Sequence, residues 1–366
     1  MGSVPVFRIV LTGGPCGGKT TCLSAITERM QGLGLQVYRI PETATLLLGG
    51  GFSVRDVSPS QLVGVEEGIL RVMMAMEDVF YAIACSTSQP AIILCDRGTM
   101  DVSAYLPRDA WTALLDENNW TVVGLRDKRY EAVIHLVTAA DGAESFYTTE
   151  NNAVRTETLA EARVLDQRVR DAWVGHPHLR VIVNAIDFAH KVQRVVAAVC
   201  QVAGVPEPRE IERKFLLRGT QAGREVPVHF EEFDIEQTYL LSQDGWERRV
   251  RRRGQQGAST YTHTMKRVVA AGQRVKIERQ ITGREYIAFL AQADPARRTL
   301  KKCRRVFLWA NQYFEWDIFK DPRPGLELLE VEVDAIDGLV ELPPFLSIER
   351  EVTQDKVYAN HTIAQE

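Results

Sequence analysis

The chain has 366 residues, of which 45% are hydrophobic and 25% are charged, and its formal net charge is −4. This length and composition are typical of a soluble globular protein with two domains of ordinary size. The small negative charge argues against a protein that coats nucleic acid, and no run approaches the roughly 18 apolar residues of a membrane span. We therefore expect a cytoplasmic protein without a nucleic-acid partner.

A phosphate-binding loop is predicted close to the N-terminus. The pattern GGPCGGKT at residues 13–20 follows a strand-like run, residues 7–11, and precedes the helix-like spacing of residues 22–26. In this order, backbone N–H groups and the positive end of the helix dipole point at one anion. Lys19 should reach the β- and γ-phosphates of a nucleotide, and Thr20 should hold Mg²⁺ through its hydroxyl. The residues predicted to bind the nucleotide are Gly13, Gly14, Gly17, Gly18, Lys19, Thr20 and Thr21.

The rest of the first half predicts an α/β fold with a parallel, doubly wound sheet. Continuous apolar runs, which are typical of strands buried on both faces, alternate with helix-like segments. The predicted strands are residues 35–40, 91–95, 132–137 and 179–184, and the predicted helices are residues 60–86, 158–173 and 188–202. Ligands of such sheets bind beyond the carboxyl ends of the strands.

Three further residues are predicted to act beside this loop. Asp96 ends a buried strand, where a carboxylate can hold nucleotide-bound Mg²⁺, although a helix N-cap would give the same pattern. Glu42 ends the second strand and would suit a general base for a substrate hydroxyl, or it is an ordinary solvated loop residue. Arg155 lies in a polar stretch where a lid over the phosphates would be, and a guanidinium there would offset developing charge.

Four segments of the first half together resemble a known family. They are GGPCGGKTT, IPETAT, ILCDRGTMD and the stretch from Thr149 to Asn184. They resemble the AAA-type P-loop domain of the group that includes the ribosylnicotinamide-kinase-like proteins, over residues 5–203. The resemblance implies binding of GTP or ATP with Mg²⁺, and it raises the question of a small-molecule kinase. The NKxD pattern of GTP-specific switches is not present, so the choice between GTP and ATP stays open.

A domain boundary is predicted at residues 203–208, where two prolines and a glycine follow an amphipathic helix. We therefore predict one domain over residues 1–205 and a second over residues 206–366. Beyond the boundary, charged residues alternate with apolar residues at the spacing of strands. An antiparallel sheet that closes into a barrel or tunnel would gather these charges inside, where a metal–polyphosphate ligand would neutralise both signs.

The second half, residues 209–363, resembles a CYTH domain, the triphosphate tunnel metalloenzyme fold, which is an α+β fold with an antiparallel β-tunnel. The resemblance implies Mg²⁺ or Mn²⁺ as cofactor, and the metal candidates are Glu210, Glu212, Asp317, Glu330 and Glu332. The candidates for phosphate binding are Lys214, Arg249, Arg251, Lys266, Lys302 and Arg304. The basic run at residues 248–253 has a second interpretation, a nucleic-acid or anionic-lipid patch. Because alternate side chains of a strand face opposite ways, one run can serve both a tunnel and a surface.

Two functions remain open at this point. In the first, the protein is an enzyme that binds a nucleoside triphosphate and whose tunnel hydrolyses a triphosphate through attack of water on a metal-bound phosphoryl group. In the second, it is a regulatory protein that binds GTP or ATP and captures a phosphorylated headgroup, so that it contacts membranes peripherally through phosphoinositides. The order of the two domains resembles a family known from insect photoreceptors, whose features are GTP binding and phosphoinositide binding.

Overall fold

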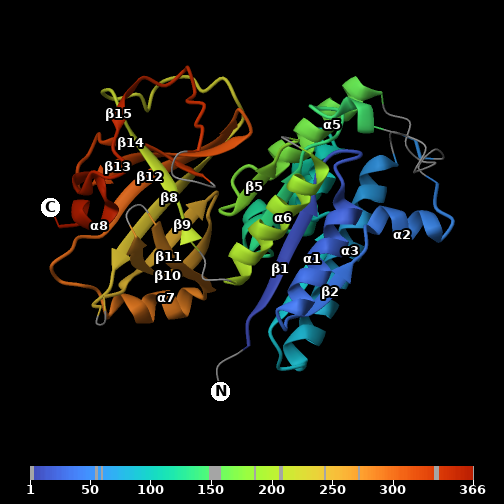
Figure 1. Ribbon diagram of the computed structural model, residues 1–366, viewed down its shortest axis with the longest axis horizontal. Helices are drawn as coiled ribbons and strands as arrows, with labels where there is room; N and C mark the ends of the chain where they lie inside the picture. Colours follow the sequence, from blue (N-terminus) through green and yellow to red (C-terminus); the bar gives the residue numbers. More distant parts are fainter. Residues whose placement is uncertain are drawn as a thin grey trace. The chain divides into compact units, whose positions relative to one another are not determined.

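The computed structural model describes residues 4–53, 57–58, 61–147, 158–184, 187–205, 209–242, 245–270, 273–333 and 338–365. The chain forms two compact units, Met1–Ala203 and Gly204–Glu366, and Figure 1 labels many of their helices and strands. Among the described residues, no helix is long and apolar enough to cross a membrane.

The first unit is built on a parallel sheet with the strand order β2-β3-β1-β4-β5. Its strands are β1 (Val6–Thr12), β2 (Gln36–Ile40), β3 (Ala91–Asp96), β4 (Ala132–Leu136) and β5 (Leu179–Ile182). Its helices are α1 (Lys19–Gly32), α2 (Thr43–Gly49), α3 (Leu62–Ser86), α4 (Arg108–Asn118), α5 (Leu159–Ala172) and α6 (Phe188–Ala203). Three short helical turns are η2 (Thr99–Ala104), η3 (Val123–Asp127) and η4 (Glu144–Phe146).

Helices cover both faces of this sheet, which is why its central strands are apolar throughout. On one face, Ile9 of β1 and Ile134 of β4 pack with Ile26 of α1 and Val195 of α6. Helix α3 contacts β1, β2 and β3 and buries Met73 in that contact layer. The predicted doubly wound parallel sheet is confirmed, and the carboxyl ends of β1, β2 and β3 meet at one edge.

The second unit is an antiparallel sheet with the strand order β15-β7-β14-β13-β12-β8-β9-β10-β11-β6. Its first strands are β6 (Arg209–Glu210), β7 (Glu212–Leu217), β8 (Phe230–Tyr239), β9 (Glu247–Gln255), β10 (Ala258–Ala270) and β11 (Gln273–Ile281). The later strands are β12 (Leu300–Trp309), β13 (Gln312–Asp321), β14 (Glu327–Glu332) and β15 (Ile348–Glu351). The helical segments are α7 (Gly283–Leu290), η5 (Lys356–Tyr358) and α8 (Asn360–Ile363).

This sheet closes on itself through its first two strands. Only Ile211 separates β6 from β7, yet β6 pairs with β11 at one end of the strand order and β7 pairs with β14 near the other. The two short strands therefore act as one strand that joins both edges, and the predicted antiparallel tunnel is confirmed.

The two faces of the closed sheet differ in chemistry. On the outside, Phe215, Phe314, Trp316 and Val331 belong to one apolar cluster. The residues that alternate with them, such as Lys214, Asp317 and Glu330, lie on the inside. Toward one end the inside also becomes apolar, where Tyr239, Leu300, Phe319 and Leu328 pack with Val352, Ile363 and Ala364 from the C-terminal segment.

Candidate phosphate-binding sites

The glycine-rich loop of the first unit connects β1 to α1 and depends on glycine at its first position. A β-carbon on Gly13 would lie 2.0 Å from the carbonyl oxygen of Leu136 on β4, and the φ angle of Gly13 is +136°. Both the contact and the left-handed backbone exclude a larger side chain. The loop therefore lies against β4 with its backbone fixed before any ligand binds.

A buried carboxylate from α5 supports the same loop. Asp166 accepts hydrogen bonds from the backbone N–H of Gly14 at 2.7 Å and of Thr138 at 3.1 Å, and its Oδ1 lies 3.1 Å from Nε2 of His135. Burial opposes ionisation, but the contacts with His135 and Gly14 hold the pKa of Asp166 below its ordinary value. Asp166 was not among the residues predicted from the sequence, because nothing in its local pattern separates it from a surface residue of a helix.

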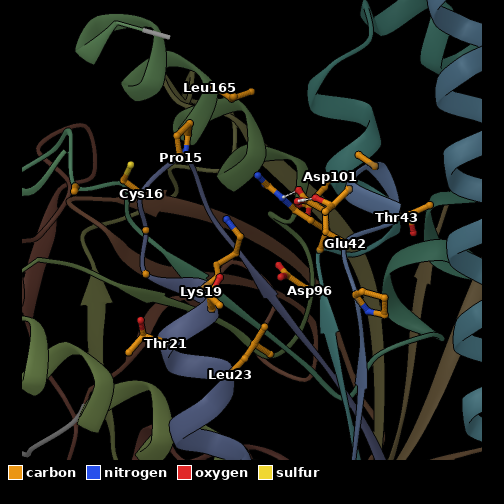
Figure 2. A pocket seen from close by; sticks show the side chains of 18 of the residues that line it. Pro15, Cys16, Lys19, Thr21, Leu23, Glu42, Thr43, Asp96, Asp101 and Leu165 are labelled. Atoms are coloured by element: carbon orange, nitrogen blue, oxygen red, sulfur yellow. Dashed lines mark hydrogen bonds and ion pairs between the residues drawn. The ribbon is translucent and has the colours of Figure 1, made fainter. Parts of the chain in front are cut away.

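Lys19, Glu42 and Asp96 converge at the edge of the sheet, as Figure 2 shows. Nζ of Lys19 donates to the carbonyl oxygens of Gly13 at 3.3 Å and Gly14 at 3.5 Å. Burial, together with the charge of Arg97, lowers the pKa of Lys19 to about 8. The charges of Asp96, Glu42 and Asp101 favour the protonated lysine, but burial and Arg97 outweigh them.

The two predicted carboxylates differ in their surroundings. Oε1 of Glu42 pairs with Nε of Arg97 at 3.2 Å. Burial raises its pKa, but the charges of Arg97 and Lys19 outweigh burial and bring the pKa of Glu42 below its ordinary value. Burial raises the pKa of Asp96, and its Oδ1 is buried without a hydrogen-bond partner among the described residues. An orphaned carboxylate oxygen beside a phosphate loop fits a divalent cation.

These residues line one cleft of about 1790 Å³. The phosphate loop with Thr20 and Thr21 forms one part of its wall, and these two exposed residues lie in the first turn of α1. Helices α2 and α3 form another part with apolar side chains such as Leu48, Ile69 and Met73. Arg155 lies outside the described residues, so its predicted place in a lid stays a prediction.

In the second unit, the predicted basic residues gather on the inside of the closed sheet. The side chains of Arg249, Lys266, Lys302 and Arg304 are buried, and Lys214 and Arg251 are partly buried. The strands that carry them are β7, β9, β10 and β12, and the predicted acidic residues Asp317, Glu330 and Glu332 lie on the adjoining β13 and β14. The side chain of Glu210 lies outside the described residues.

Ion pairs connect four strands of this interior. Asp317, which is 0% exposed, pairs with Nζ of Lys302 and accepts from Nε and Nη2 of Arg304 at 2.6 Å each. Nη2 of Arg304 also donates to Oε2 of Glu330 at 3.1 Å. Oε1 of Glu330 lies 2.6 Å from Nζ of Lys214. Both oxygens of Asp317 are thus occupied by cations.

Arg251 on β9 stands apart from these pairs. Its Nη2 donates to Oε1 of Gln237 at 3.3 Å, and its Nε is buried without a hydrogen bond among the described residues. Burial and the charges of Arg249 and Arg304 lower the pKa of Arg251 to about 10. An anion beside a guanidinium in such surroundings stabilises its positive charge.

The fit of a metal to this interior depends on Glu212 and Glu332. They lie directly opposite each other where β7 pairs with β14. Carboxylates opposite each other in a sheet repel, and a divalent cation between them would relieve that repulsion. Within the described ranges, no three His, Cys, Asp or Glu residues gather as a complete metal site.

Replacing Gly13 with alanine should destabilise the first unit, because a β-carbon would meet the Leu136 carbonyl. We expect Gly13→Ala to lower the free energy of unfolding by about 2 kcal/mol or more, measured by urea denaturation. Gly32→Ala is the matched control, since no atom lies within 4 Å of a β-carbon there. Equal stabilities for the two variants would contradict the described contact.

Comparison with known proteins assigns both units. Residues 8–191 match the family model described as an AAA domain, and residues 208–356 match the CYTH domain. No curated protein matches the chain.

Solved structures similar to the chain cover one unit each. An inorganic triphosphatase shares 28% identity, covering 43% of this chain and 95% of its own, with a TM-score of 0.30. A protein from Hippeastrum, named for adenylyl cyclase and described as having dominant triphosphatase activity, shares 17% identity over 34% of this chain and 80% of its own, with a TM-score of 0.27. Thymidylate kinase from Ehrlichia chaffeensis shares 14% identity over 54% of this chain and 98% of its own, with a TM-score of 0.37. By its family matches, the chain belongs to the AAA domain family and carries a CYTH domain after its P-loop domain.

Proposed function

We propose that the protein is a two-domain phosphate enzyme. Its P-loop domain binds GTP or ATP with Mg²⁺, and its CYTH tunnel binds and hydrolyses a triphosphate. The observation that carries the proposal is the state of Arg251, a guanidinium held inside the tunnel near Arg249 and Arg304 with its Nε unpaired among the described residues. A chain of phosphates would neutralise this excess of positive charge.

Each part of the tunnel has a proposed role. Arg249, Arg251 and Lys266 on β9 and β10 bind phosphate oxygens together with Arg304 on β12, which only β8 separates from β9. Glu212, Glu330 and Glu332, with Glu210, would hold Mg²⁺ or Mn²⁺. A divalent cation there supplies polarisation of a phosphoryl oxygen. Asp317 is 0% exposed and pairs with two cations, so we propose that it positions Lys302 and Arg304 and does not bind the metal directly.

Replacing Arg251 should abolish hydrolysis in the tunnel, because a phosphate oxygen would lose its charged donor. In the full-length chain we expect Arg251→Ala to reduce phosphate release from inorganic triphosphate, with Mg²⁺ or Mn²⁺, by roughly 100-fold or more. Glu330→Gln should have a similar effect. The matched control is Arg252→Ala, because Arg252 is the next residue on β9, has a 39% exposed side chain and pairs with Glu236 at 3.4 Å.

Two outcomes would contradict hydrolysis. One is full activity of Arg251→Ala. The other is no metal-dependent release from the wild-type chain together with binding to phosphoinositide vesicles. The latter would favour the regulatory alternative, which agrees with the family features of the TRPL translocation defect protein that the domain order resembles.

The P-loop lysine gives a second test, based on pH. Nucleotide phosphates favour charged Lys19, whereas the empty loop holds its pKa at about 8. Affinity for GTP or ATP should therefore be constant below about pH 8 and fall above it as Lys19 loses its proton. Lys19→Ala should bind weakly and without this pH dependence, whereas Lys128→Ala, at an exposed lysine away from the cleft, should match the wild type. An unchanged affinity for Lys19→Ala, measured by calorimetry, would contradict the loop assignment.

A second candidate function for the P-loop domain is phosphorylation of a small molecule. The cleft of about 1790 Å³ exceeds the roughly 300–1000 Å³ of a pocket for one ligand, so it has room for an acceptor beside the nucleotide. Its apolar wall contains Glu66, which is 9% exposed and whose pKa burial raises to about 7. Glu66 would hydrogen-bond the acceptor, and Glu42 would take the proton of its hydroxyl.

This kinase activity is tested with a panel of nucleosides and sugars as acceptors and radiolabelled ATP or GTP as donor. We expect transfer to at least one acceptor, with Glu66→Leu reducing it by roughly 10-fold or more through loss of the hydrogen bond. Glu67→Leu, at the adjacent residue that pairs with Arg71 at 2.8 Å, should leave transfer unchanged. Hydrolysis without transfer to any acceptor would count against the kinase.

A further inference from the structure

Of the aromatic side chains that line the cleft, Phe146 and Phe188 are more exposed than Phe52 and Tyr105. Phe146 at the end of η4 is 78% exposed, and Phe188 at the start of α6 is 48% exposed. Both line the same cleft as the phosphate loop with Thr20 and Thr21. Large apolar side chains that stay exposed inside a concave site commonly mark a ligand contact.

The segments that carry the two rings are fixed to one another by Asn184. Its Nδ2 donates to the carbonyl oxygens of Thr138 at 2.7 Å and Asp141 at 2.8 Å. Its Oδ1 accepts from Nζ of Lys191 on α6 at 2.7 Å. The turn that leads to Phe146 and the helix that begins with Phe188 are therefore connected by one side chain.

Phe188 also contacts the phosphate loop itself. A β-carbon placed on Gly18 would lie 2.5 Å from Cε2 of the Phe188 ring. The ring thus lies against the backbone that would surround the phosphates, next to the residue that begins α1. A nucleotide whose phosphates occupy the loop can extend its sugar and base along this wall.

The polar side chains nearby are already engaged in the fold. The amide of Asn184 is occupied as described, and Nζ of Lys191 also donates to the carbonyl oxygen of Val137 at 2.7 Å. Oδ1 of Asp187 accepts from the backbone N–H of His190 at 2.7 Å. The described side chains of Asn184, Asp187 and Lys191 are thus already engaged and do not offer free groups to the edge of a base, whereas the face of any base can stack on an aromatic ring.

We propose that Phe188 and Phe146 form a stacking site for the nucleobase of the nucleoside triphosphate, and that this site accepts the purines of ATP and GTP alike. The inference rests on the proposed nucleotide binding by the P-loop domain. It adds to that function the residues that bind the base and the use of both purines.

The test compares ligands with and without a base. Dissociation constants for ATP, GTP and inorganic triphosphate are measured with Mg²⁺ in the full-length Arg251→Ala chain, so that the tunnel contributes little. Adding Lys19→Ala to this chain removes binding by the P-loop, so the difference between the two chains gives the binding due to the P-loop site. Into this background are placed Phe188→Ala, Phe146→Ala, Phe188→Leu and Phe188→Trp, with Tyr81→Ala, an exposed aromatic residue of α3 outside the cleft, as the matched control.

Loss of stacking should weaken ATP and GTP by roughly 5- to 100-fold in the Phe→Ala variants while leaving inorganic triphosphate within about twofold. Phe188→Trp should retain nucleotide binding, and Phe188→Leu should lose it despite keeping an apolar contact with Gly18. Equal weakening of all three ligands would overturn the inference, because Phe188 would then only support the loop. An ATP-to-GTP affinity ratio above about 10 would overturn the equal use of both purines. If Lys19→Ala changes the binding of no ligand, the proposed nucleotide binding itself fails.

Discussion

The interior of the CYTH unit depends on one carboxylate, Asp317, which pairs with two cations inside the sheet. Removing such a partner from a buried ion pair typically costs about 3–5 kcal/mol, because an uncompensated charge is left behind. From Asp317 the pairing continues through Arg304 to Glu330 and on to Lys214. With Glu315, which also pairs with Arg304, three cations and three carboxylates are paired on β7, β14, β13 and β12. Arg251 lies on β9, which β8 separates from β12, and burial and neighbouring arginines disfavour its charge. An anion in the tunnel would therefore be stabilised most beside β9.

The two proposed phosphate sites differ in their physical basis. In the P-loop unit, backbone N–H dipoles would bind the phosphates, and Gly13 and the carboxylate of Asp166 hold the backbone in place. In the CYTH unit, charged side chains on a closed sheet would do so. A backbone site loses little entropy when it binds and reads the shape of a phosphate. A site made of charged side chains gains more Coulomb energy, but its cations must not all be paired with carboxylates of the protein before the ligand binds.

The sequence predicted the features that depend on local spacing. The glycine pattern at residues 13–20, the continuous apolar strands and the alternating charges of β7, β9 and β14 each fix a local geometry, and both folds followed from them. Contacts between distant segments were not predictable. Asp166 lies 152 residues from Gly14, and only the packing of α5 brings them together. Helix α2 was not predicted, because its seven residues are too few for a periodic pattern. Phe188 resembled any apolar residue of an amphipathic helix until its exposure was known.

The strand that closes the tunnel is also the first strand after the junction between the units. Glu212 and Lys214 lie on it, and Arg209 and Glu210 pair with the far edge of the sheet at β11. Tension applied along the backbone from the first unit would therefore act on the seam of the ring before any other strand. One short run of residues therefore follows the junction between the units, closes the tunnel and carries part of its charged lining.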